Sequence, residues 1–245
     1  MTDGLLLVHG HPLDGSMWEA QVSSLRDRVS VVAPDMPGFG GTPGTGDVMT
    51  MADGARRCLE ALDEAGVDRA VVCGISMGGY IALELWRSSR DRVAGFVFAN
   101  TRAGADDEAG KERRRALAWR LRAEGNGFLV EQPPPLLSAG APEVLWDRVK
   151  GIIAAQPAEA IAAAALGMAE RVDSTPDLPG IDVPTLVVTS TGDTLIPSEA
   201  TTPMAEAIPG AQLEALEGAG HLSNLEASDE FTGLLEEHLR RCGIL

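Results

Sequence analysis

The sequence predicts an α/β fold, in which a twisted, mostly parallel sheet of about six strands is covered by helices on both faces. Two observations predict it. Short, continuously apolar runs alternate with helical patterns along most of the chain, and unbroken apolar runs are typical of buried parallel strands. Between residues 101 and 184 this alternation stops, and the sequence there is helical and alanine-rich. That stretch predicts a helical insertion, because crossovers between parallel strands are normally much shorter.

Five apolar runs and one alternating run are expected to form the strands. The alternating run, residues 212–216, suits a position near an edge of the sheet. The expected strands are Leu5–Val8, Val29–Ala33, Ala70–Cys73, Val93–Phe98, Thr185–Thr189 and Gln212–Leu216.

The helices between these strands have clear periodicity and end signals. Residues 55–65 carry apolar side chains at helical spacing, Thr50 with Asp53 resembles a capping box, and Gly66 is suited to end the helix. The last helix has an apolar stripe made by Phe231, Leu234, Leu235 and Leu239.

The domain organisation follows from the interruption. Residues 1–100 and 185–245 are expected to form the core, and residues 101–184 a helical lid over the carboxyl edge of the sheet. Within the lid, helices are expected over residues 106–124, 142–156 and 157–172. The alternative is that these helices simply pack on a face of the sheet. The alanine-rich run 160–165 indicates close helix packing.

Composition and charge exclude several classes of partner. The chain has 245 residues and a net charge of −16, which argues against nucleic acid and anionic membranes, since both attract clustered Lys and Arg. The one basic cluster, residues 111–115, follows acidic residues and is interpreted as a solvated, ion-paired helix face. Three cysteines without a C-x-x-C motif, and an N-terminus unlike a signal peptide, predict a cytoplasmic protein. The sequence gives no oligomeric state.

One motif points to nucleophilic catalysis. Gly74-Ile75-Ser76-Met77-Gly78 follows an expected strand and precedes a helical segment, so Ser76 is expected on a sharp strand-to-helix turn. Such a turn lifts the serine hydroxyl clear of the sheet, and small residues two positions to either side avoid a steric collision. An ordinary strand-to-helix turn is the alternative interpretation.

An activated serine needs a base and a group that orients the base. Among four histidines, His221 lies in a glycine-rich loop after the last strand, whereas His238 lies among apolar positions of the final helix. Asp193 follows the strand at residues 185–189 and is the expected orienting acid. Asp35 is the competing carboxylate, but its Pro- and Gly-rich surroundings favour bracing of its own loop.

A tetrahedral intermediate also needs backbone donors for its oxyanion. The N–H of Met77, directly after the serine, is one expected donor. The other is expected from the loop after the first strand, where Pro12 has no N–H, and His11 is the choice. A structural hydrogen bond in that loop is the expected role of His9.

Together these motifs resemble the α/β-hydrolase superfamily. The resemblance covers nearly the whole chain and rests on the order and spacing of five motifs: His9-Gly10-His11-Pro12, Asp35-x-x-Gly38-x-Gly40, Gly74-Ile75-Ser76-Met77-Gly78-Gly79, Gly192-Asp193-x-x-x-Pro197 and Gly218-x-Gly220-His221. Within the superfamily the serine motif looks like the small esterase, lactonase and perhydrolase branch, similar to 3-oxoadipate enol-lactonases. The family usually begins with an antiparallel hairpin, which is expected to be missing here. The resemblance therefore implies about six parallel strands, with residues 29–33 at an edge of the sheet.

The resemblance implies a serine hydrolase that cleaves an ester, lactone or thioester through a Ser76–His221–Asp193 triad and an acyl-enzyme, without metal or organic cofactor. A cofactor-free perhydrolase, or a lyase or cyclase on the same fold, is the enzymatic alternative. A ligand receptor with a hydrolase fold is the alternative from another class.

The substrate is expected to be a small or medium, largely apolar acyl compound. Trp119 in the lid and Leu195 after the acid are the expected pocket residues. Each has a competing role in packing.

Overall fold

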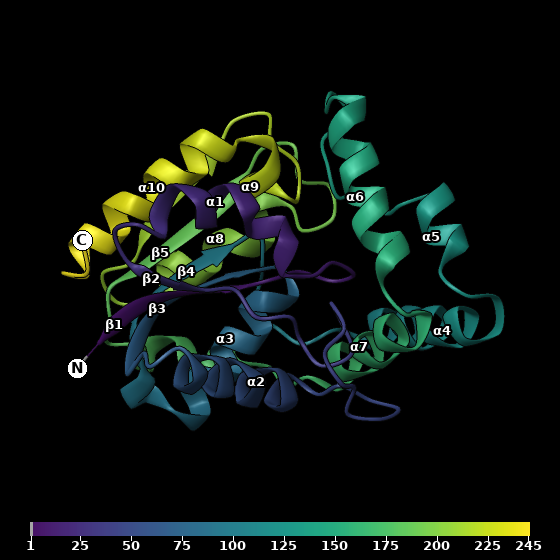
Figure 1. The fold of residues 1–245 in the computed structure, drawn as a ribbon, viewed down its shortest axis with the longest axis horizontal. Helices are drawn as coiled ribbons and strands as arrows, with labels where there is room; N and C mark the ends of the chain where they lie inside the picture. The colour runs from purple at the N-terminus through teal and green to yellow at the C-terminus, as the bar shows by residue number, and fades with distance from the viewer. Residues whose placement is uncertain (1) are drawn as a thin grey trace.

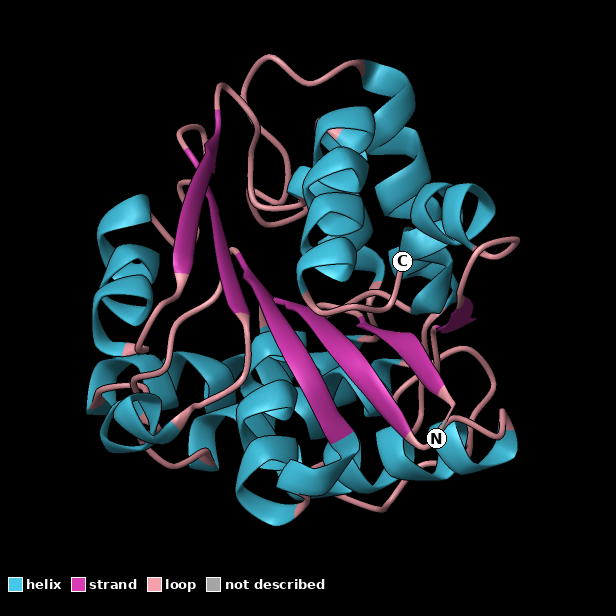
Figure 2. Ribbon diagram, turned by 90° about the vertical axis from the view of Figure 1, so that its left-hand side faces the viewer, coloured by secondary structure: helices cyan, strands magenta, loops and turns pink. Residues whose placement is uncertain are grey.

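The computed structural model describes residues 2–245, and its centre is a parallel sheet of six strands. The strands lie in the order β2-β1-β3-β4-β5-β6, and Figure 2 shows them fanned as a twisted sheet. Their bounds are β1 Asp3–Val8, β2 Ser30–Val32, β3 Arg69–Ile75, β4 Val93–Ala99, β5 Thr185–Ser190 and β6 Gln212–Leu216. All five pairings are parallel, so the predicted fold class is confirmed.

Helices cover both faces of this sheet. Figure 1 shows α1 and α10 on one face and α2 and α3 on the other. The α-helices are α1 Glu19–Leu25, α2 Met51–Glu64, α3 Met77–Ser88, α4 Glu108–Glu124, α5 Gly127–Glu131, α6 Glu143–Ala155, α7 Ala158–Glu170, α8 Ser198–Ala207, α9 Ser223–Glu226 and α10 Ser228–Arg241. Three short 3₁₀ helices join them, at Gly15–Trp18, Arg90–Arg92 and Thr175–Gly180.

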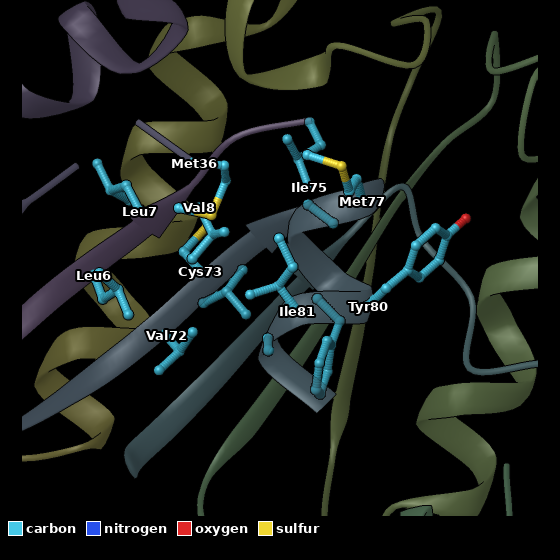
Figure 3. Close-up of a cluster of buried hydrophobic side chains, with 14 of the residues drawn as sticks. Leu6, Leu7, Val8, Met36, Val72, Cys73, Ile75, Met77, Tyr80 and Ile81 are labelled. Carbon is cyan, nitrogen blue, oxygen red and sulfur yellow. The ribbon is translucent and has the colours of Figure 1, made fainter. Parts of the chain in front are cut away.

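The buried strands are the continuously apolar ones. Every residue from Gly4 to Val8 in β1 and from Ala70 to Ile75 in β3 is buried, because both strands lie inside the sheet between two helical layers. Figure 3 shows side chains of both strands in one buried cluster that includes Ile81 of α3. The edge strand β6 is exposed over its first four residues, so its alternating sequence reflects an edge position and not one buried face.

The predicted end signals of α2 are also confirmed. The hydroxyl of Thr50 accepts from the N–H of Asp53 at 3.1 Å, and the carboxylate of Asp53 accepts from the N–H of Thr50 at 2.9 Å. These reciprocal bonds satisfy two donors that a helix N-terminus otherwise leaves free. Gly66 follows the helix with φ of 66°, a conformation that favours glycine.

Residues 101–184 contain no strand in the structure, and α4 to α7 make up most of this insertion. Figure 1 shows these four helices grouped beside the sheet, at the carboxyl ends of the strands. The alanines of α7 are buried, and a Cβ on Gly167 would lie 1.8 Å from the carbonyl oxygen of Met49. The small residues of α7 therefore allow close packing against the core loop that precedes α2.

No single helix within residues 2–245 is long and apolar enough to cross a membrane. The pair α6 and α7 reaches that length and hydropathy only when taken together, and it is bent by 95°.

Candidate active site

Ser76 occupies the turn between β3 and α3, at the carboxyl end of the sheet. Its backbone has φ of 54° and ψ of −116°, which is a strained conformation for a residue with a side chain. Three hydrogen bonds hold it there. The N–H of Ser76 donates to Ala99 at 3.0 Å, and its carbonyl accepts from Gly79 N–H at 2.9 Å and Thr101 Oγ1 at 2.7 Å.

The structure explains why glycines flank Ser76 in the serine motif: a larger side chain at either position would collide with the backbone. A Cβ on Gly74 would lie 2.3 Å from the carbonyl oxygen of Gly78, and a Cβ on Gly78 would lie 2.2 Å from the carbonyl oxygen of Val8. The turn and the first strand approach each other so closely that only glycine fits. This close approach brings the start of α3 against the loop after β1.

We expect Gly78→Ala to lower the free energy of unfolding by about 1–3 kcal/mol, because the backbone must move to admit the new methyl group. Gly151→Ala in α6 is the matched control, since its Cβ would meet nothing within 4 Å. That variant should be unchanged or more stable by about 0.5–1 kcal/mol. Urea denaturation of both variants measures the difference, and equal midpoints would contradict the packing described.

The structure brings His221 and Asp193 together. His221 Nδ1 lies 2.8 Å from Asp193 Oδ2, and both side chains are buried. The carboxylate also accepts the N–H groups of Leu195 and Ile196, each at 2.9 Å, and Nδ2 of Asn100 at 3.0 Å. Four donors therefore fix the carboxylate.

This arrangement sets the ionisation of Asp193 and the tautomer of His221. Burial raises the pKa of Asp193, but the hydrogen bonds and charge of His221 and the bonds from Ile196 and Asn100 outweigh it, so that the pKa lies below its ordinary value. An ionised Asp193 accepts the Nδ1 proton of His221, which leaves Nε2 as the basic nitrogen. His221 Nε2 is buried and has no hydrogen-bond partner within the described chain. It is therefore free to take a proton from a reacting group.

The loop that carries His221 is fastened to the helical insertion. Glu226 Oε2 accepts the N–H of Gly220 and the N–H of Ser138, each at 2.9 Å. The N–H of Leu222 donates to the carbonyl of Leu136 at 2.8 Å, and a Cβ on Gly220 would lie 2.2 Å from the nitrogen of Ser138. Residues 136–138 thus hold the histidine loop from the insertion side.

The loop after β1 places two histidines beside the serine turn. His9 Nδ1 lies 3.1 Å from the carbonyl of Gly10, and its Nε2 accepts the N–H of Met36 at 3.0 Å. Burial lowers the pKa of His9, so the ring is neutral and ties two loops together, which is the structural role predicted for it.

His11 contacts the insertion. Its Nε2 lies 3.0 Å from the carbonyl of Ile161 in α7, and burial lowers its pKa to about 4. The neutral ring therefore donates from Nε2. Its backbone stands next to Gly10, whose Cβ would lie 3.4 Å from the Cβ of Ser76. Met77 is the first residue of α3, so its N–H has no partner within that helix.

A cavity of about 620 Å³ opens at Ser76. One wall comes from the core and the other from the insertion. The core wall is formed by His11, Pro12, Ser76, Tyr80, Leu195 and Ile196. Leu195 lines the cavity as expected, with 43% of its surface exposed, and Figure 3 shows the Tyr80 hydroxyl pointing away from the apolar cluster.

The expectation that Trp119 walls the pocket is wrong. Its side chain is 72% exposed and does not line the cavity. The cavity-facing residues of α4 recur at helical spacing from Gly110 through Arg113 and Leu117. Position 119 lies about 200° around the helix from position 117, so its side chain points elsewhere.

Comparison of the chain with protein-family models identifies its family. Residues 5–234 match the family model described as the alpha/beta hydrolase family. The chain belongs to the alpha/beta hydrolase family. This match spans the serine turn, the acid and the histidine together, and it confirms the predicted resemblance.

Known alpha/beta hydrolases show the same fold and a range of ester chemistry. The chain is similar to the structure of a thermophilic esterase from Thermogutta terrifontis with malate bound (40% identity, TM-score 0.93, 99% of this chain and 92% of that one). It is 30% identical to 3-oxoadipate enol-lactonase 1 of Acinetobacter baylyi, over 89% of this chain and 81% of the relative. It is 26% identical to pimeloyl-[acyl-carrier protein] methyl ester esterase of Aeromonas hydrophila, over 95% of this chain and 93% of the relative.

Other residues of this hydrolase fill structural roles. Asp35 accepts the N–H of Gly15 at 2.7 Å, so it ties its loop to the segment after β1 and does not brace its own loop alone as predicted. His238 is buried in α10, 3.5 Å from the sulfur of Cys242. Within residues 2–245 no three His, Cys, Asp or Glu side chains gather as a metal site requires.

Asn100 and the arginines that line the cavity were not predicted as site residues. Asn100 follows β4 with φ of 44°. The sequence signal that could have found it is an Asn directly after an apolar strand, because Asn is enriched among residues with positive φ. Its Nδ2 lies 2.7 Å from Ser190 Oγ, and its Oδ1 accepts the hydroxyl of Ser223 at 2.6 Å. The basic cluster at residues 111–115 was interpreted as a solvated face, but Arg113 and Arg114 line the cavity.

Proposed function

We propose that this alpha/beta hydrolase is a serine hydrolase that cleaves an ester, lactone or thioester through an acyl-enzyme on Ser76. The observation that carries the proposal is the buried His221–Asp193 pair, whose free Nε2 lies at the same sheet edge as a strained serine. The similarity to an esterase, an enol-lactonase and a methyl ester esterase supports the same class of reaction.

In the proposed reaction, His221 Nε2 takes the proton of Ser76 as its oxygen attacks the carbonyl carbon. Asp193 holds the Nδ1 proton and stabilises the imidazolium that forms. The N–H groups of Met77 and His11 receive the oxyanion. Loss of one such donor typically costs about 2.7–4 kcal/mol of transition-state stabilisation. His221 then protonates the leaving group, and water that it activates releases the acid.

The insertion, residues 101–184, is proposed to act as a lid. It supplies one wall of the cavity, and residues 136–138 hold the histidine loop. A small to medium acyl compound suits a cavity of about 620 Å³. A cytoplasmic location is part of the proposal, and the three cysteines are unpaired in the described chain.

The test is turnover of a panel of esters, lactones and thioesters by the purified protein. The proposal expects release of acid and alcohol or thiol from at least one class, with hydroxylamine trapping the acyl group. A product that takes up no oxygen from ¹⁸O-labelled water would instead favour the lyase or cyclase, because hydrolysis of any of the three substrate classes adds water to the acyl carbon. Binding of a ligand that survives unchanged would favour the receptor.

A further inference from the structure

The cavity wall contributed by the insertion is strongly basic. Four arginines but only two acidic residues line the cavity. The basic residues are Arg102, Arg113, Arg114 and Arg120, and the acidic ones are Asp106 and Glu131. The whole chain carries a net charge of −16, so this concentration of positive charge runs against its overall composition.

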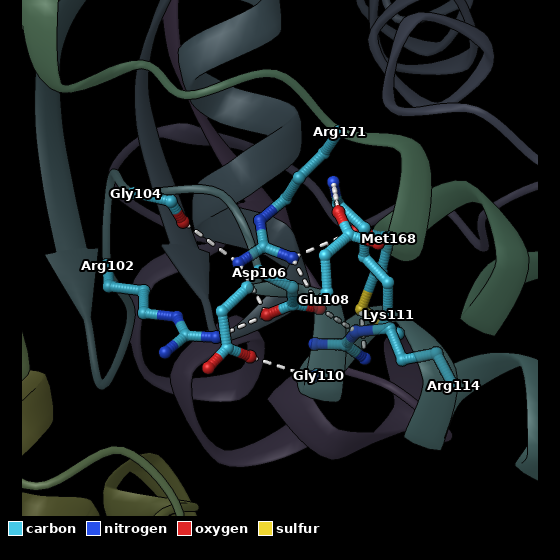
Figure 4. A network of polar contacts seen from close by, with 10 residues as sticks. Arg102, Gly104, Asp106, Glu108, Gly110, Lys111, Arg114, Met168 and Arg171 are labelled. Atoms are coloured by element: carbon cyan, nitrogen blue, oxygen red, sulfur yellow. Dashed lines mark hydrogen bonds and ion pairs between the residues drawn. The ribbon is translucent and has the colours of Figure 1, made fainter.

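One buried carboxylate of this wall is paired with three guanidinium groups, two of which line the cavity. Asp106 forms ion pairs with Arg102, Arg114 and Arg171, and Figure 4 shows the three arginines converging on it. Arg171 is also buried and stacks on the ring of Tyr80 at 4.2 Å. In the described part of the chain none of the three has a second carboxylate partner, so the cluster holds an excess of two positive charges.

The two remaining arginines of the wall, Arg113 and Arg120, are exposed residues that line the cavity, and they differ in their partners. Arg120 is paired with Glu124 at 2.9 Å and lies over the ring of Phe128. Arg113, by contrast, lines the cavity and forms no ion pair with any described residue. Its neighbours Lys111 and Arg115 on the same helix are paired with Glu108 and Glu112.

We propose that the substrate carries an oxyanion at the end of its acyl part remote from the scissile bond, and that Arg113 receives it. Arg102 and Arg114 also attract the oxyanion, because the single charge of Asp106 does not compensate the charges of the arginines paired with it. A guanidinium binds a carboxylate or phosphate through two parallel N–H groups, so the site fits either group. This inference rests on the proposed hydrolysis at Ser76 and adds a charge to the largely apolar substrate expected from the sequence.

The overall negative charge does not oppose this binding at close range. Exposed charges are screened beyond about 10 Å at 0.1 M salt, so the nearby arginines dominate inside the cavity. The rate constant kcat/KM for an anionic ester should therefore fall as salt rises, whereas that for a neutral ester should change little.

The test compares two esters that differ in charge alone. Mono-(4-nitrophenyl) adipate ends in a carboxylate, and the 4-nitrophenyl ester of adipic monoamide has nearly the same shape without the charge. Wild type should prefer the anionic ester in kcat/KM by about tenfold, mostly through KM, as expected of a hydrogen bond to a charged group. Homologues from adipate to suberate, which are too long for rapid self-cleavage through a five- or six-membered cyclic anhydride, find the best length. A phosphonate-terminated ester distinguishes phosphate from carboxylate preference.

Arg113→Gln should reduce the ratio of the two kcat/KM values by about tenfold. Arg115→Gln is the matched control, because it removes the same charge from the same helix but does not line the cavity. The control should keep the wild-type ratio. Equal effects of the two variants, or no preference for any anionic ester in wild type, would overturn the inference. Absence of hydrolysis of both esters would instead contradict the proposed function.

Discussion

Ser76→Ala is expected to reduce kcat for ester hydrolysis by about 10⁴-fold or more, because the acyl-enzyme cannot form without the hydroxyl. Its side chain accepts and donates no hydrogen bond on which the turn depends, since the bonds to Ala99, Gly79 and Thr101 use the backbone of Ser76. The free energy of unfolding should therefore change by less than about 1 kcal/mol.

Asp193→Asn and His221→Ala should each remove most of the same activity. The three residues act as a unit, so a double variant should be little worse than Ser76→Ala alone. Steady-state kinetics of the single and double variants measures this. Multiplicative losses, or near-normal turnover in Ser76→Ala, would contradict the mechanism.

Asp106→Asn is expected to lower the free energy of unfolding at neutral pH by about 3–5 kcal/mol. The reason is that removal of one partner from a buried ion pair leaves the other charge uncompensated. Here Arg171 is buried and loses both of its contacts to the carboxylate, at 3.0 Å each. Glu108→Gln is the control, because it makes the same charge change at an exposed pair with Lys111 and should leave stability nearly unaltered.

The pH dependence of that variant provides a second readout. Burial raises the pKa of Asp106, but hydrogen bonds and charge from Arg171 and Arg114 outweigh it and hold the pKa well below its ordinary value. The carboxylate therefore contributes stability at pH values above its unfolded pKa, and this contribution is lost as pH falls through the lowered folded pKa. The difference in the free energy of unfolding between wild type and Asp106→Asn should therefore become smaller at acidic pH. A difference that stays constant from neutral to acidic pH would contradict the claim that Asp106 is ionised in the folded protein.

The sheet and its helices were largely predictable because local sequence and tertiary burial agree there. The runs in β1 and β3 are continuously apolar, and a strand between two helical layers has no face that needs polar side chains. The capping box of α2 lies within four residues, so it needs no tertiary information. The short helix α5, only five residues long, was not predicted, because so short a segment carries no full period.

In the insertion, the side chains that face the cavity could not be predicted from the sequence. Lys111 and Arg115 do form the predicted ion pairs on α4, whereas Arg113 and Arg114 on the same helix face the cavity. Which side of a polar helix meets a cavity is decided by its packing against other elements, here α7, and not by its own periodicity. Trp119 was expected in the pocket because it lies in the expected lid, and its orientation likewise could not be predicted from local sequence.

The most direct test of the central claim is covalent labelling by a fluorophosphonate, read by intact mass on wild type and Ser76→Ala. An activated serine attacks phosphorus and displaces fluoride, which adds one phosphonyl group. We predict a single adduct on wild type and none on the variant. A folded wild type that stays unlabelled, or an equal adduct on Ser76→Ala, would contradict the assignment of Ser76 as the nucleophile.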